Sequence, residues 1–124
     1  MTIALWCILA MMLVTYGFTI AAKSNPDFSN RTPRAYLQNL QEGWRQRAHW
    51  AQANSFEAFP PFAAAVLVAH LTDAPQAQAD MLALAFVGIR IIYGLCYIWD
   101  KPTLRSLVWT AGIGCVVGLF GISA

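Results

Sequence analysis

The first 22 residues of the chain carry no charged side chain. About 20 apolar residues in a helix are enough to cross the hydrocarbon core of a bilayer. A cleaved export signal would start with Lys or Arg ahead of a shorter apolar run, whereas this segment starts with MTIALW. The segment therefore predicts a membrane-spanning helix that is retained in the protein.

Three further apolar stretches follow the first one. Of the 124 residues, 58% are hydrophobic and only 11% are charged, which lies outside the usual range of soluble globular domains. With the first segment counted, the pattern predicts spans at about residues 2–22, 45–71, 80–99 and 103–122. Little of the chain remains outside them. We therefore expect an all-α membrane protein in which residues 1–124 form a single bundle of four transmembrane helices.

The basic residues cluster in two of the three connecting regions. Five of them lie between or beside the ends of the first two spans, two lie between the third and fourth spans, and residues 72–79 contain none. By the positive-inside rule, both basic regions face the cytoplasm and the two termini lie on the non-cytoplasmic side. The net charge of +2 then follows from topology, and we expect no nucleic-acid partner.

Glu57 and Arg90 are the two ionisable residues that fall well inside predicted spans. A charge at mid-membrane costs about 3 kcal/mol on insertion scales, so it is normally paired or faces a polar cavity. Glu57 lies ten residues beyond Arg47, or roughly 15 Å into the membrane, and Arg90 lies nine residues before Trp99, or roughly 14 Å from the same face. The two charges are therefore expected at matching depths.

Other polar side chains follow helical spacing around these two charges. They are Trp50 and Asn54 with Glu57 on the second span, Tyr93 and Tyr97 with Arg90 on the third, and Arg105 at the start of the fourth. Two interpretations fit this pattern. The groups line one cavity that opens to the cytosol, or a Glu–Arg pair braces two helices while the tyrosines anchor the membrane interface.

Two consecutive prolines follow this polar stripe. Pro60 and Pro61 have no amide hydrogen, so the carbonyls of Phe56 and Glu57 lose their usual helical donors. We expect a kink or a local opening beside Glu57, which either improves packing alone or shapes a pocket. On the fourth span, Gly114 and Gly118 form a GxxxG pair, which predicts a close contact with another helix.

Three sequence motifs resemble one known family. WAQANSFEAFPPF, RIIYGLCY and LRS occur in the order and at the membrane depths seen in the MAPEG family, the membrane-associated proteins of eicosanoid and glutathione metabolism. The resemblance extends from RTPRA through Trp109. It implies a left-handed four-helix bundle assembled as a homotrimer, with glutathione bound between neighbouring subunits near the cytoplasmic face.

The resemblance also implies individual site residues. Asn54 and Glu57 match the positions that hold the glutathione backbone and amine, and Arg105 matches an arginine that stabilises the thiolate. Ser106 stands beside it, so Arg105 and Ser106 are the implied catalytic residues. The implied glutathione-binding residues are Arg47, Gln52, Asn54, Glu57, Arg90, Tyr93 and Tyr97. No pattern of metal ligands is present, and we expect no metal.

The chain departs from the family pattern at three positions. Trp50 stands where the family often has an arginine that grips a ligand carboxylate, and Arg47, one turn earlier, is expected to substitute for it. Ala58 and Trp109 replace hydroxyl-bearing aromatic residues of the leukotriene and prostaglandin branches. The sequence is therefore more similar to bacterial members, which implies a location in the bacterial inner membrane.

The resemblance implies a glutathione-dependent transferase, with peroxidase activity as a further option. Glutathione is the expected co-substrate, and the expected partners are a lipophilic electrophile, membrane lipids and further copies of the chain. A non-catalytic binding or scaffold protein of the same fold is the main alternative. A small multidrug transporter is less favoured, because those proteins carry an essential glutamate in their first span and this first span has no acidic residue.

Overall fold

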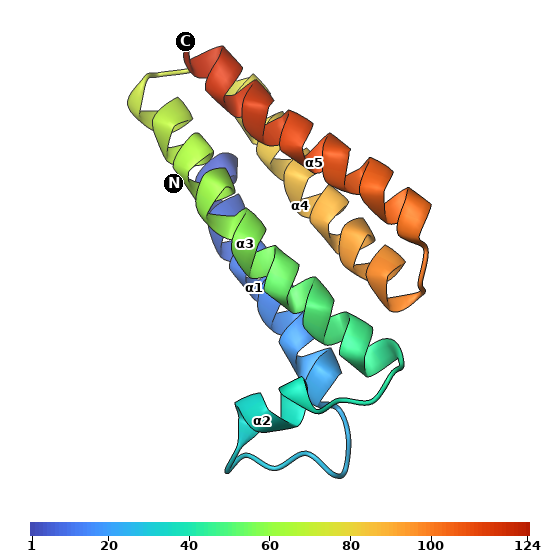
Figure 1. The fold of residues 1–124 in the computed structure, drawn as a ribbon. Coiled ribbons are helices and arrows are strands. Elements are labelled where there is room, and N and C mark those ends of the chain that lie inside the picture. The colour runs from blue at the N-terminus through green and yellow to red at the C-terminus, as the bar shows by residue number, and fades with distance from the viewer.

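The chain folds into helices joined by short connections. The computed structural model describes all 124 residues, and the five helices are α1 (Ile3–Lys23), α2 (Pro33–Gln38), α3 (Trp44–Leu71), α4 (Gln76–Ile98) and α5 (Pro102–Ser123). Figure 1 shows the four long helices alternating in direction along one axis. Both termini lie at one end of the bundle, and α2 lies at the opposite end with the α4–α5 connection.

Three of the long helices, α1, α4 and α5, are long and apolar enough to cross a membrane. The bounds of α1, α3 and α5 agree within one residue with the spans expected at 2–22, 45–71 and 103–122. The helix expected to start at residue 80 begins at Gln76, because the amides of Gln78 and Ala79 already bond to the Pro75 carbonyl. Hydropathy detects only the apolar part of such a helix.

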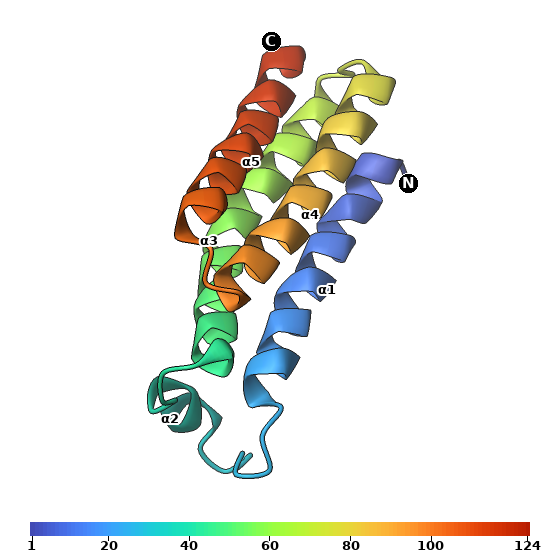
Figure 2. The ribbon, with the colours of Figure 1, turned by 90° about the vertical axis from the view of Figure 1, so that its right-hand side faces the viewer.

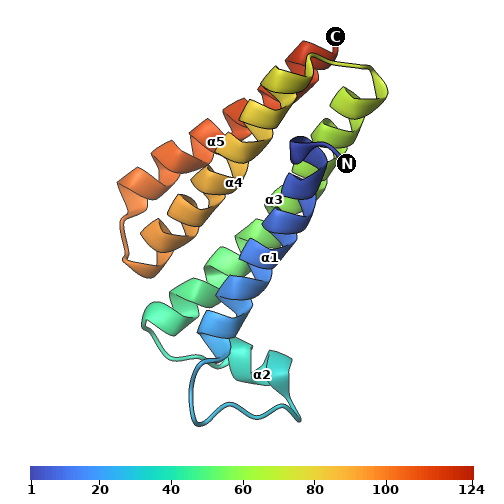
Figure 3. The ribbon, with the colours of Figure 1, turned by 180° about the vertical axis from the view of Figure 1, so that it is seen from behind.

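α3 is the most polar of the long helices, although its 28 residues are sufficient to span a bilayer. It packs against α1, α4 and α5, and α4 packs against α1, α3 and α5 (Figures 2 and 3). Of the polar side chains of α3, only Ser55 is fully buried in the bundle, whereas Glu57 is exposed. The helix runs without interruption through Pro60 and Pro61, so the expected local opening is not seen as a break.

The main hydrophobic core fills the half of the bundle that is nearer the termini. Its large members are Met11, Phe62, Phe86 and Leu119, and the rings of Phe62 and Phe86 stack with centroids 4.1 Å apart. At the terminal end, the Asp80 carboxylate of α4 accepts a hydrogen bond from the Ala4 amide of α1 at 2.8 Å. All four depressions in the surface are lined by residues of the other half of the bundle.

Small residues set the spacing between helices. A Cβ atom added to Gly94 of α4 would lie 1.8 Å from the Phe18 ring of α1, so only glycine allows this contact. On α5, Gly118 lies close to Leu82, since an added Cβ would be 3.3 Å from that side chain. Gly114, the other half of the GxxxG pair, has no such neighbour. The pair therefore does not form one contact within the chain.

The connection between α1 and α3 contains the short helix α2. Thr32 is its N-cap and Pro33 its first residue, a position that suits proline because its missing amide hydrogen would have no helical acceptor there. Leu37 is buried against Ala22 and Ala48 and attaches α2 to the ends of α1 and α3. The end of the bundle near α2 thus has its own small core.

Candidate functional site

Arg90 is the centre of a polar cluster in the half of the bundle near α2. The residue is 2% exposed, and its Nη2 donates hydrogen bonds to Asn54 Oδ1 at 2.8 Å and to Ser55 Oγ at 3.3 Å. The guanidinium carbon also lies 4.1 Å from the centre of the Tyr93 ring. A buried cation is costly unless such groups compensate it, and the Nε of Arg90 still has no partner.

Aromatic rings extend the cluster from α4 to α5. The Tyr93 and Tyr97 rings meet edge to face with centroids 5.9 Å apart, and Trp50 lies 6.2 Å from Tyr97. The guanidinium carbon of Arg105 lies over the Tyr97 ring, 4.3 Å from its centre. Three helices thus contribute to one continuous row of cations and aromatic rings.

An open depression of about 420 Å³ lies beside this row. Its lining residues are Trp50, Ala53, Asn54, Glu57 and Tyr97. The Oδ1 of Asn54 is occupied by Arg90, so the amide NH₂ of Asn54 is left to donate to a ligand. The Glu57 carboxylate is an acceptor for a cation on the same wall. We refer to this space as the Asn54 depression.

The sequence pattern predicted which residues lie in this cluster better than it predicted which side chains bond to Arg90. Arg90 bonds to Asn54 and Ser55, one helical turn before the expected partner Glu57, which is exposed on the outside of the chain. Ser55 was missed. It is fully buried on the small-residue face that includes Ala48 and Ala51, and a lone polar residue on that face was the available signal.

Six of the nine predicted site residues do not line the Asn54 depression. Arg90, Tyr93 and Arg105 belong to the row of cations and rings beside it, whereas the other three make contacts elsewhere. Arg47 donates from Nε to the Ile98 carbonyl at 2.9 Å. Gln52 points to another side of α3, where its Oε1 lies 3.3 Å from the Nδ1 of His49. The exposed Ser106 hydroxyl donates to the Pro102 carbonyl of its own helix at 3.1 Å.

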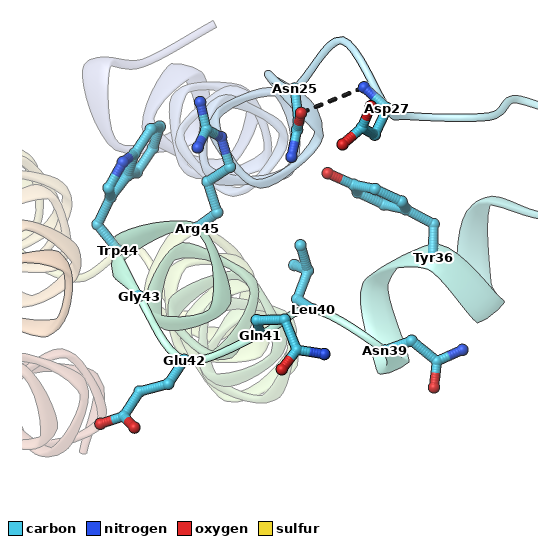
Figure 4. A pocket seen from close by; sticks show the side chains of 10 residues that line it. All are labelled: Asn25, Asp27, Tyr36, Asn39, Leu40, Gln41, Glu42, Gly43, Trp44 and Arg45. Atoms are coloured by element: carbon cyan, nitrogen blue, oxygen red, sulfur yellow. Dashed lines mark hydrogen bonds between the residues drawn. The ribbon is translucent and has the colours of Figure 1, made fainter.

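A larger depression of about 470 Å³ lies between the α1–α2 connection, α2 and the first turn of α3 (Figure 4). Hydrogen bonds join its walls, including one from Arg45 Nε to the Ser24 carbonyl and one from Gln46 Nε2 to the Leu40 carbonyl. The Tyr36 hydroxyl is buried and has no partner. No residue predicted for the glutathione site lines this depression.

The arrangement defines a class of protein. A bundle with three membrane-spanning helices, a buried arginine and a polar depression in one half is an integral membrane protein with a polar site among its helices. No group of three or more His, Cys, Asp and Glu side chains is placed to hold a metal ion.

Comparison with known proteins identifies the family. The sequence matches the model of the MAPEG family over residues 1–124, and the chain belongs to that family. A search of curated proteins finds no significant match. The family includes glutathione transferases and peroxidases as well as members without catalytic activity.

Proposed function

We propose that the protein is a glutathione-dependent transferase that acts on a lipophilic electrophile. The observation that carries the proposal is the position of Arg105, whose guanidinium carbon lies 4.3 Å from the centre of the Tyr97 ring. Tyr97 is a wall of the Asn54 depression. A fixed cation therefore stands next to a space that offers both donors and an acceptor.

The lining groups complement a small zwitterionic peptide. The Glu57 carboxylate is suited to the ammonium group of glutathione, and the free amide NH₂ of Asn54 is suited to a carboxylate or peptide oxygen. Arg90 acts behind them, because its hydrogen bond to Asn54 fixes the direction of that amide. It is thus a positioning residue rather than a ligand contact.

The role of Arg105 is to stabilise the thiolate of the bound glutathione. A thiol with a pKa of about 8.5 is only about 3% ionised at pH 7, and a neighbouring cation that lowers this pKa by one unit raises the thiolate to about a quarter. The thiolate sulfur then forms a bond to an electrophilic carbon, and the leaving group departs with the displaced electron pair. In the peroxidase option, the same thiolate attacks the terminal oxygen of a hydroperoxide, the O–O bond breaks and the alkoxide leaves as the alcohol. A second glutathione then reduces the sulfenic acid to the disulfide and water.

The positions of Gln52 and Asn54 support a site shared between copies. These residues are two positions apart on α3, so they point about 200° apart around the helix and do not reach one ligand within a single chain. A glutathione held between neighbouring copies contacts the Asn54 face of one and the Gln52 face of the next. The homotrimer expected from the family provides such an interface.

The membrane supplies the second substrate. Large apolar side chains such as Leu107, Ile113 and Val117 are exposed along α5 and suit contact with lipid tails. The two loop regions rich in Lys and Arg lie at the end of the bundle that contains the site, and the positive-inside rule supports a cytoplasmic position for this end. The proposed location is the bacterial inner membrane, with glutathione bound from the cytoplasmic side. Both termini then lie on the opposite side.

A non-catalytic role in glutathione or lipid binding is the second candidate. One observation favours it: Trp50 is 45% exposed and takes part of the wall where a cation would help to bind a carboxylate. The two candidates differ in thiolate formation. A binding protein needs no activated sulfur, whereas a transferase does.

The test is the ultraviolet absorbance of the glutathione thiolate in protein purified in detergent. We expect wild type to increase this absorbance near neutral pH and to conjugate an aromatic electrophile. Arg105→Ala is expected to suppress both signals, and Lys101→Ala, which removes an exposed positive charge near the same end of α5, is expected to leave them unchanged. Glutathione binding without thiolate absorbance would favour the non-catalytic candidate.

A further inference from the structure

A smaller depression of about 230 Å³ adjoins the Asn54 depression. It is lined by Glu42, Gln46, Arg47, Trp50 and Asp100. Trp50 lines both spaces, so its half-exposed indole is the wall between them. A ligand longer than the Asn54 depression would pass this indole and enter the smaller space, which we name the Asp100 depression.

The Asp100 depression favours positive charge. It contains two carboxylates, from Glu42 and Asp100, and one guanidinium, from Arg47. Figure 4 shows the Glu42 carboxylate turned away from the centre of the larger depression near α2. The Nε of Arg47 is already used by the Ile98 carbonyl at the C-terminal end of α4, where the helix dipole adds negative potential.

The indole adds a second attraction for cations. The face of a tryptophan ring attracts ammonium groups, and Trp50 is 45% exposed at the boundary of the two spaces. A free carboxylate at this position would meet two like charges and an uncharged ring, against a single guanidinium, that of Arg47. A ligand that ends in an amine would instead meet groups that stabilise it.

We propose that the preferred thiol of this site is a glutathione-type peptide whose glycine carboxylate is replaced by an amide that ends in an amine. The peptide occupies the Asn54 depression, and its cationic tail passes Trp50 to reach Glu42 and Asp100. This inference rests on the proposed function and names the substrate class of the same site.

The experiment compares three thiols by isothermal titration calorimetry on the full chain in lipid nanodiscs. The probes are glutathione, its uncharged glycine amide and its glycine 3-aminopropyl amide, all kept reduced. We expect the aminopropyl amide to bind about tenfold more tightly than glutathione, with the uncharged amide between them. The advantage should shrink as salt is added, because exposed charges are screened.

Variants locate the effect. Trp50→Arg should reverse the order and favour glutathione, and Glu42→Gln with Asp100→Asn should remove the preference for the amine. Asp100 has a positive φ of 56°, which asparagine tolerates. Asp73→Asn is the matched control, because Asp73 has a φ of 53° and lies in the α3–α4 connection, at the opposite end of α4 from Asp100.

Each outcome has a distinct meaning. Equal affinity for the three thiols overturns this inference and leaves the proposed function standing. A preference for the amine that survives in the variant without both carboxylates overturns the role of the Asp100 depression. If none of the three thiols binds at millimolar concentration, the proposed function fails and this inference fails with it.

Discussion

The contact between Gly94 and Phe18 gives a sharp test of the packing that holds the site. In Gly94→Ala, the new Cβ would lie 1.8 Å from the Phe18 Cζ and 2.4 Å from each of two further ring atoms. Carbon atoms pack at about 3.5 Å or more, so the ring must retreat by about 1.7 Å. Phe18 is 8% exposed, and the ring has little room to move without separating α1 from α4.

We expect Gly94→Ala to lower the free energy of unfolding by about 2–3 kcal/mol, the upper part of the range for overpacked cores. Thermal unfolding in detergent, followed by tryptophan fluorescence, measures this change. Glutathione affinity should fall as well, because Gly94 adjoins Tyr93 on the helix that carries Arg90.

A double variant separates the clash from other effects. Phe18→Ala alone removes a buried ring and should cost about 3 kcal/mol. In the Phe18→Ala background, Gly94→Ala should cost less than about 0.5 kcal/mol, because the ring that it strikes is absent. A wild-type melting temperature for Gly94→Ala would refute the packing, and an undiminished cost in the double variant would show that the clash is not its cause.

Three further predictions concern single side chains. Arg90→Met should weaken glutathione binding about tenfold, because Asn54 is then free to turn. The free energy of unfolding should change by less than about 2 kcal/mol, because buried charges stabilise poorly. Calorimetry and thermal unfolding measure the two effects, and unchanged affinity would contradict the positioning role of Arg90. Asp80→Asn should cost about 1 kcal/mol of stability, since it removes the charged acceptor at the N-terminus of α1. The same substitution at Asp73 should change the melting temperature little. Equal losses of stability in the two variants would argue against a specific role for the bond between Asp80 and the Ala4 amide. Co-assembly of Asn54→Ala with Gln52→Ala chains should restore part of the activity that each variant lacks alone, because some sites then combine two unaltered side chains. Mixed assemblies no more active than the average of the two variants would exclude a shared site.

The amino-acid sequence determined the class of the protein and the order of its polar groups along each helix. Uncharged runs of about 20 residues can be buried only as helices in a bilayer, because every backbone polar group then bonds within its own segment. The fixed rise and turn of a helix also place Asn54 and Glu57 on one stripe and Tyr93 and Tyr97 on another. Those relations are local, and the sequence predicts them.

Only the tertiary structure decided which groups meet. A helix can slide by one turn of 5.4 Å or rotate without changing its own hydrogen bonds, and either movement exchanges one partner for another. The offset is set by contacts between helices, such as Phe18 on Gly94. With this offset, Arg90 bonds to Asn54 and Ser55 instead of the expected Glu57.

The same offset between helices placed Trp50 between two depressions. From the sequence it is an interfacial aromatic residue in the place of a family arginine, and its spacing predicts only that it lies near Tyr97. Packing of α3 against α4 brings Asp100 beside it and makes the indole the wall between two depressions. That arrangement depends on residues 50 positions apart in the chain, which no helical periodicity relates.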